Sequence, residues 1–169
     1  MKQLWNWNGF EIAWQVEGED NQKEIAIILI HGFGACKDHW RFNQKILSSI
    51  APCYALDLIG FGESSQPNSQ LLYEKEITEH FYYSFDNWSQ QIVDFCNEIV
   101  QKRIFLIGNS IGAVIALNAS KNISKVCSGL ILIDCAQRTM DDKRLIEKSL
   151  LMRFLRPIIK TIVRQRFLS

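Results

Sequence analysis

Ser110 lies at the centre of the run Gly108-Asn109-Ser110-Ile111-Gly112, in which a glycine stands two residues away on each side. The run follows an apolar stretch at 104–107 that is typical of a buried strand, and it opens a small-residue stretch at 111–120 that is typical of a helix. Between a strand and a helix, G-x-S-x-G predicts a sharp turn that projects the serine hydroxyl. The helix amino terminus behind that turn favours developing negative charge. We therefore expect Ser110 to be a nucleophile, with Gly108 and Gly112 letting the backbones pass.

A second glycine-containing run, His31-Gly32-Phe33-Gly34, follows the apolar stretch Ile25–Ile30. Acyl transfer passes through a tetrahedral oxyanion, and each preorganised donor aimed at it contributes roughly 3–4 kcal/mol. We expect the backbone N–H groups of Phe33 and Ile111 to be these donors, with Gly32 and Gly34 shaping the loop. For His31 we favour bracing of the loop by hydrogen bonds over a role as general base.

Two aspartates follow predicted strands. Asp57 precedes Ser110 in the chain, and we expect it to accept hydrogen bonds from loop amides rather than to act in catalysis. Asp134 follows the apolar stretch Leu130–Ile133 and has two readings. It is either an acid that orients a catalytic histidine or a strand-end residue that caps the next turn, and the sequence leaves both open.

The strands that must position these residues are recognisable from their apolar patterns. Trp5–Trp7 and Phe10–Val16 predict a hairpin whose tight turn is Asn8-Gly9, and the second strand alternates between apolar and polar faces. Ile25–Ile30 is continuously apolar, as a strand covered on both faces must be. Three later stretches have the same character: Cys53–Leu58, Ile104–Ile107 and Leu130–Ile133.

Helices are predicted between these strands. Asp38–Ile50 and Asn87–Val100 carry apolar residues near helical spacing, and Ile111–Ser120 is short and rich in small residues. Strands that alternate with helices predict mostly parallel pairing and a three-layer α/β sandwich. Gln66–Ser84 is irregular and is expected to be a surface excursion.

The strand-end runs HGFG, DLIGFGES and GNSIG, in this order, resemble those of the α/β-hydrolase superfamily. With Trp5-x-Trp7, His39-Trp40-Arg41 and Asp134-Cys135-Ala136-Gln137-Arg138, the chain looks like the pheophytinase and chlorophyll dephytylase branch. The resemblance implies an α/β-hydrolase sandwich, no cofactor, and a small-molecule carboxylic ester substrate such as a long-chain or phytyl ester. It makes Ser110 the nucleophile and Phe33 and Ile111 the oxyanion amides.

The family's general base is a histidine after the eighth strand, and nothing in this chain matches it. Its histidines, His31, His39 and His80, all precede Ser110. We expect strands one to six within residues 1–139 and the start of a helical cap or lid at 140–169, so that the chain is a hydrolase truncated in its cap region. The alternative is a non-catalytic remnant or binding module that retains the hydrolase pocket.

Composition and charge limit the partners, metal sites and cellular location that the sequence predicts. The 169 residues suit about one domain, and a net charge of +1 does not favour nucleic acid. No metal-ligand motif is present, and five cysteines without a C-x-x-C pair predict a reduced, cytoplasmic chain. The basic, apolar segment 143–166 either packs on its own domain, which we favour, or makes a peripheral membrane contact. The oligomeric state stays open.

Overall fold

The computed structural model of the protein describes residues 3–20, 23–69 and 80–135. The predicted boundary after residue 139, the predicted cap at 140–169 and the predicted membrane contact at 143–166 lie outside the described residues. No helix within the described ranges is long and apolar enough to cross a bilayer.

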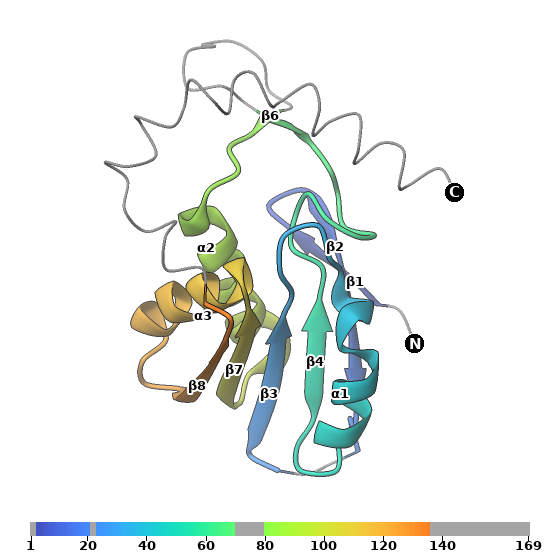
Figure 1. Ribbon diagram of the computed structural model, residues 1–169, viewed down its shortest axis with the longest axis vertical. Helices are drawn as coiled ribbons and strands as arrows, with labels where there is room; N and C mark the ends of the chain where they lie inside the picture. The colour runs from blue at the N-terminus through green and yellow to red at the C-terminus, as the bar shows by residue number, and fades with distance from the viewer. Residues whose placement is uncertain (1–2, 21–22, 70–79, 136–169) are drawn as a thin grey trace. The chain divides into compact units, whose positions relative to one another are not determined.

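Six strands form one sheet, in the order β1-β2-β4-β3-β7-β8 (Figure 1). Their bounds are β1 Gln3–Trp7, β2 Phe10–Glu17, β3 Ile25–Ile30, β4 Cys53–Leu56, β7 Arg103–Asn109 and β8 Cys127–Ile133. The pairs β1/β2 and β2/β4 are antiparallel, whereas β3/β4, β3/β7 and β7/β8 are parallel. The predicted mostly parallel six-stranded sheet is therefore confirmed.

The predicted amino-terminal hairpin is also confirmed. Asn8 and Gly9 both have positive φ, 52° and 86°, as a tight two-residue hairpin turn requires. The apolar face of β2 packs into the core through Ile12 and Trp14. Because Gln15 on the other face lies under a helix rather than in water, that second face is only partly exposed.

Among the described residues, three α-helices accompany the sheet. They are α1 Arg41–Leu47, which follows a 3₁₀ turn at Lys37–Trp40, α2 Phe85–Phe95, which continues as a π-helical turn at Cys96–Val100, and α3 Ile111–Asn122. Figure 1 shows α1 next to β4 and α3 next to β7 and β8, and α2 packs along α3. A two-residue parallel ladder joins β5 Asn68–Ser69 to β6 His80–Phe81 in the predicted excursion.

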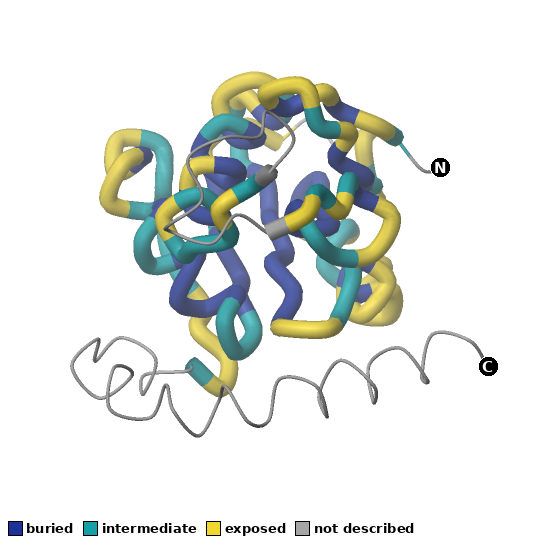
Figure 2. The backbone as a smooth tube through the Cα atoms, turned by 90° about the horizontal axis from the view of Figure 1, so that it is seen from above, coloured by how far each residue is buried: buried dark blue, intermediate teal, exposed yellow. Residues whose placement is uncertain are grey.

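Side chains of β3 alternate between two cores. Ile28 and Ile30 pack with residues of α2 and α3. Ile27 and Leu29 pack with Trp40, the residue that directly precedes α1 in the chain. The central strands are buried and the exposed residues lie at the periphery, as Figure 2 shows. Layers on both faces of the sheet explain why β3 and β4 are continuously apolar.

Large apolar residues are exposed in two places, and at the second of them the predicted burial is wrong. The apolar residues Ile46 and Ile50 at 38–50 are 70% and 58% exposed, because α1 is held to the sheet by Trp40 and Gln44 instead. Leu130–Ile133 was expected to be covered on both faces, yet Ile131 is 49% exposed and Ile133 43%. The reason is position: within the described residues β8 is an edge strand, paired on one side by β7.

Candidate active site

Ser110 occupies the turn between β7 and α3 and has a strained backbone. Its φ of 55° and ψ of −115° lie outside the regions that a side chain with a Cβ adopts readily. The side chain makes no capping hydrogen bond to α3, and the residue is partly exposed. The chain therefore holds a serine hydroxyl at a sharp strand–helix turn, outside the packed interior.

Close packing around this turn requires its glycines. A Cβ on Gly108 would meet the backbone carbonyl of Gly112, and a Cβ on Gly112 would lie 2.6 Å from the carbonyl oxygen of His31. A Cβ on Gly32 would lie 3.4 Å from the Cβ of Ser110. The loop after β3 and the amino end of α3 therefore meet at Ser110. Because the glycines have no side chains, the backbones of these two segments pack directly against each other.

The two residues predicted to supply oxyanion donors lie on the two segments that meet at this turn. Ile111 is the first residue of α3, so its N–H is one of the four that an α-helix leaves without an internal acceptor. Phe33 follows Gly32 in the adjoining loop, and the left-handed φ of 71° at Gly34 turns the chain there. The structure thus brings together the loop of Phe33, Ser110 and the start of α3.

His31 is fully buried and both of its ring nitrogens are engaged. Nε2 accepts a hydrogen bond from the Leu58 N–H at 3.0 Å, which assigns the proton to Nδ1, 2.7 Å from the Gly32 carbonyl oxygen. Burial lowers the pKa of His31 below its ordinary value of 6.5. The imidazole thus joins two strand-end loops as a neutral group, in the geometry expected of a bracing residue.

Asp57 lies in the interior and binds the loops on either side of it. Its carboxylate accepts hydrogen bonds from the backbone N–H groups of Lys37 and Glu63, and the Lys37 ammonium lies 3.4 Å from Oδ2. Burial alone would lower the pKa of Lys37, but the carboxylates of Glu63 and Asp57 reverse this and raise it. Asp57 therefore accepts hydrogen bonds from loop amides, as its position after a strand and before Ser110 predicts.

Asp134 directly follows β8 and has a positive φ of 46°. The Ser110 N–H donates to the carbonyl oxygen of Ile133 at 2.9 Å, so Asp134 is one residue away from a direct backbone contact with the turn. Its side chain is exposed. This position is compatible with both roles that the sequence left open.

Gln91 and Lys37 support the site and were not singled out from the sequence. Gln91, fully buried on α2, accepts from the Ile59 N–H at 3.1 Å and donates to the Asp57 carbonyl at 3.4 Å. A glutamine within the apolar stripe of a predicted helix is the signal that could have identified it. Lys37 carries no comparable signal, because a lysine in a loop is normally exposed.

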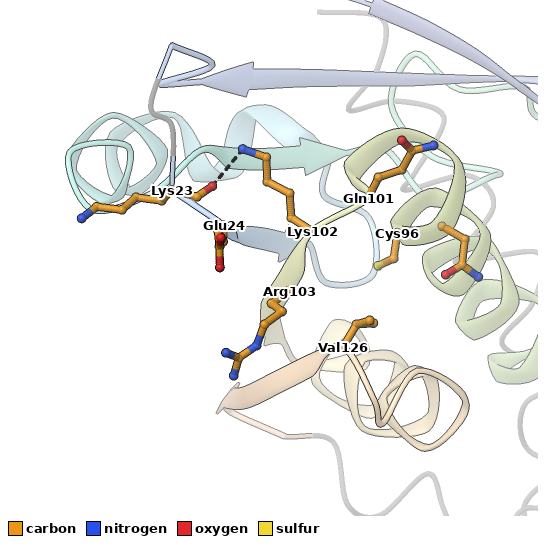
Figure 3. Close-up of a pocket in the computed structure, with 8 residues that line it drawn as sticks. Lys23, Glu24, Cys96, Gln101, Lys102, Arg103 and Val126 are labelled. Atoms are coloured by element: carbon orange, nitrogen blue, oxygen red, sulfur yellow. Dashed lines mark hydrogen bonds between the residues drawn. The ribbon is translucent and has the colours of Figure 1, made fainter.

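A recess lies at the other end of the sheet. It has a volume of about 630 Å³ and is lined by Lys23, Glu24, Cys96, Asn97, Gln101, Lys102, Arg103 and Val126 (Figure 3). Lys102 and Arg103 stand at the amino end of β7, whereas Ser110 follows its carboxyl end. Ligands of parallel α/β sheets bind outside the carboxyl ends of the strands, so this recess is not the candidate site. Within the described ranges, no cluster of three His, Cys, Asp or Glu residues could hold a metal ion.

Comparisons with known proteins agree with this geometry. Residues 25–164 match a family model described as the alpha/beta hydrolase fold. The chain is 32% identical over 127 residues to the 1-acylglycerol-3-phosphate O-acyltransferase ABHD5 of Rattus norvegicus, and 29% identical over 122 residues to the (lyso)-N-acylphosphatidylethanolamine lipase of Mus musculus. These alignments cover 75% and 72% of this chain but 34% and 33% of the relatives.

Solved structures show the same fold. A membrane phospholipase A, described as a bacterial virulence factor, superposes with a TM-score of 0.68 at 31% identity. The superposition covers 80% of this chain and 40% of the phospholipase chain. A lipase structure from Acinetobacter baumannii superposes with a TM-score of 0.67 at 21% identity, which supports the fold alone. The chain therefore spans about a third of the length of these curated relatives, and its aligned part includes the strand–turn–helix unit at Ser110.

Proposed function

We propose that this chain, which belongs to the α/β-hydrolase family, carries the nucleophile and oxyanion hole of a serine hydrolase that cleaves carboxylic esters. The observation that carries the proposal is the strained backbone turn at Ser110, which lies close to Gly32 in the loop after β3. The relatives supply the class of chemistry, since their names describe a lipase and an acyltransferase.

In the proposed reaction the Ser110 Oγ attacks the acyl carbon of the ester and loses its proton to a general base. The carbonyl oxygen becomes an oxyanion that accepts hydrogen bonds from the Phe33 and Ile111 N–H groups. Collapse of this intermediate breaks the bond to the alcohol, which takes the proton, and leaves an acyl group on Ser110. Attack by water then releases the acid and restores the serine.

The general base is not assigned to His31, because both of its ring nitrogens already bind backbone groups. His39 is exposed on the 3₁₀ turn before α1, and no contact to Ser110 supports it as the base. We assign to Asp134 the role of orienting the base, because Ile133 beside it binds the turn of Ser110. Activity of the whole protein therefore rests on a base other than His31 and His39.

An apolar surface beside the turn favours a long-chain substrate. The Phe33 ring is 70% exposed and packs edge-to-face on Phe61, with ring centroids 5.4 Å apart. Phe61 in turn contacts His31 and Trp88. We therefore propose an ester with a long apolar chain, a class that includes the acyl esters of lipids and the phytyl esters implied by the sequence resemblance.

The experiment that tests the proposal uses a fluorophosphonate probe and added imidazole. A serine without its base reacts slowly, and free imidazole can take the proton in its place. We expect imidazole-dependent labelling of Ser110, identified by peptide mass spectrometry, and none at this position in Ser110→Ala. Ser49→Ala, on an exposed turn after α1, is the matched control and should label like the native chain.

The same samples distinguish hydrolysis from binding alone. Turnover of p-nitrophenyl esters that increases with chain length and is lost in Ser110→Ala supports the hydrolase. If neither labelling nor turnover occurs with imidazole, while a long-chain ester still binds and Phe33→Ala weakens that binding, the chain is a binding module that retains the pocket.

A further inference from the structure

The helix α1 buries a glutamine against the sheet and exposes apolar side chains on its outer side. Gln44 is fully buried, and its amide donates to the carbonyl oxygens of Cys53 at 2.7 Å and Gln15 at 3.3 Å. The outward residues Phe42, Ile46 and Ile50 are 69%, 70% and 58% exposed. The chain thus buries an amide and leaves three large apolar side chains in water.

These three residues, here called the α1 stripe, follow one another at a spacing of four. Side chains at this spacing lie on one face of a helix. After Leu47 the chain continues in a tighter turn, in which the N–H groups of Ser49 and Ile50 donate to the carbonyl oxygens of Ile46 and Leu47, three residues back. Phe42 and Ile46 therefore lie on α1 itself, and Ile50 lies on the turn that ends it. A contiguous apolar stripe on an outer helix face marks an interaction surface, unlike single exposed apolar residues.

Opposite charges stand at the two ends of the α1 stripe. At the amino end the Arg41 guanidinium lies 4.4 Å from the centroid of the Phe42 ring. At the carboxyl end the turn after β2 approaches α1 closely, because a Cβ on Gly18 would lie 3.0 Å from the Cβ of Ser48. Glu17 and Glu19 flank that glycine and are exposed.

Glu17 lies on the side of the sheet that carries α1. Successive side chains of a strand alternate between faces, so Glu17 shares a face with Gln15. The Gln15 side chain donates to the Gln44 amide oxygen at 2.9 Å, which places that face beneath α1. The stripe therefore has the Arg41 cation at one end and the Glu17 carboxylate at the other, and the exposed Lys45 lies between them on α1.

We propose that the α1 stripe is a self-association surface that a second copy of this chain covers, with the two α1 helices antiparallel and a two-fold axis near Ile46. In such an arrangement Phe42 of each copy faces the partner's Ile50, and Arg41 of each copy approaches the partner's Glu17. A two-fold interface must be complementary to itself, and a stripe with opposite charges at its ends meets that requirement.

The charges favour a second copy over an anionic lipid surface. Lipid-binding helices carry cations along the whole boundary of the apolar face. Here the carboxylates of Glu17 and Glu19 stand at one end of the stripe and would repel anionic headgroups. Antiparallel pairing instead places each carboxylate by a guanidinium and also aligns the two helix dipoles favourably.

Sedimentation equilibrium over a range of protein concentrations tests the proposal without any assay of activity. We expect a reversible dimer for the native chain and a dissociation constant raised roughly tenfold or more in Ile46→Ser, since truncation at an interface centre has large effects. Leu4→Ser, which changes an exposed apolar residue of β1 outside the stripe, is the matched control and should leave the dimer intact.

A charge exchange identifies the arrangement of the two copies. Arg41→Glu and Glu17→Arg should each weaken the dimer, and the double variant should restore it, because each opposed pair then has complementary charges again. A monomer at every concentration overturns the proposal. A dimer that survives Ile46→Ser also overturns it and points to another surface, such as the exposed edge of β8. So does a monomer that binds phosphatidylcholine–phosphatidylglycerol vesicles through Ile46, which assigns the stripe to lipid.

Discussion

The helices α1 and α2 have similar apolar spacing in the sequence but different surroundings in the structure. Both show apolar residues at helical spacing, yet α2 buries Trp88, Ile92 and Phe95, whereas α1 exposes Ile46. The neighbours explain the difference: α2 packs along α3, and no described helix lies beside α1. Helical spacing therefore predicts that a helix forms, while the arrangement of its neighbours decides which residues it buries.

Each of the two helices also buries one glutamine. Gln91 on α2 and Gln44 on α1 are both fully buried, and both bind backbone groups at strand ends. Each glutamine fixes the rotation of its helix about the axis, because a buried backbone carbonyl or N–H without a partner is costly. On α1 this constraint turns the apolar stripe outward.

The largest expected effect compares two isoleucines. Ile92→Ala on α2 should reduce the free energy of unfolding by about 2–5 kcal/mol, because it opens a cavity in the core. Ile46→Ala on α1 should change it by less than about 0.5 kcal/mol in the monomer, as for other exposed positions. Urea denaturation at low protein concentration measures both, and equal losses would contradict the exposed placement of Ile46.

A glutamine substitution tests whether the buried amide outweighs hydrophobicity. Gln44→Leu should destabilise the chain by about 1–3 kcal/mol even though it adds apolar surface, because the carbonyls of Cys53 and Gln15 lose their donor. Gln44→Glu is a shape-matched comparison and should be worse, since a carboxylate cannot donate. A stabilised Gln44→Leu chain would show that α1 is free to rotate its stripe inward.

The amino termini of the helices differ in capping. The Ser84 hydroxyl accepts a hydrogen bond from the Asn87 N–H at 3.1 Å, whereas Trp40 before α1 makes no side-chain cap. Ser84→Ala should therefore cost about 1 kcal/mol, and Ser84→Asp should retain the stability. Circular dichroism during thermal unfolding measures the change, and an unaltered midpoint in Ser84→Ala would argue against the cap.

The smallest expected effect is a pH dependence of stability that comes from His31, which binds the same loop after β4 as Gln91 of α2. Because burial lowers the pKa of His31 below 6.5, the unfolded chain binds this proton more readily than the folded one. Its contribution to stability is complete above pH 6.5 and falls as the pH decreases, with a slope of at most about 1.4 kcal/mol per pH unit. Urea titrations at several pH values between 7.5 and 5.8 give the free energy of unfolding at each pH. This free energy should fall less steeply with decreasing pH in His31→Gln than in the native chain.

Much of the fold was predictable because its signals are local. The turn at Asn8-Gly9, the apolar run Ile25–Ile30 and the glycines around Ser110 each state a conformation within a few residues. The exposure of Ile131 and Ile46 was not predictable in this way, because burial depends on which elements lie next to β8 and α1. The supporting role of Gln91 was hidden for the same reason: its partners at Asp57 and Ile59 are more than thirty residues away in the sequence.

The hydrogen bond from the Ser110 N–H to the Ile133 carbonyl has a consequence for how the chain folds during translation. Ser110 leaves the ribosome well before β8, and a strained residue of this kind costs of order 1–3 kcal/mol until its surroundings hold it. A nascent chain that ends before Ile133 lacks this restraint, so its serine relaxes. The proposed nucleophile would then acquire its strained conformation only when the last described strand joins the sheet, which delays reactivity until the surrounding strands and helices are in place.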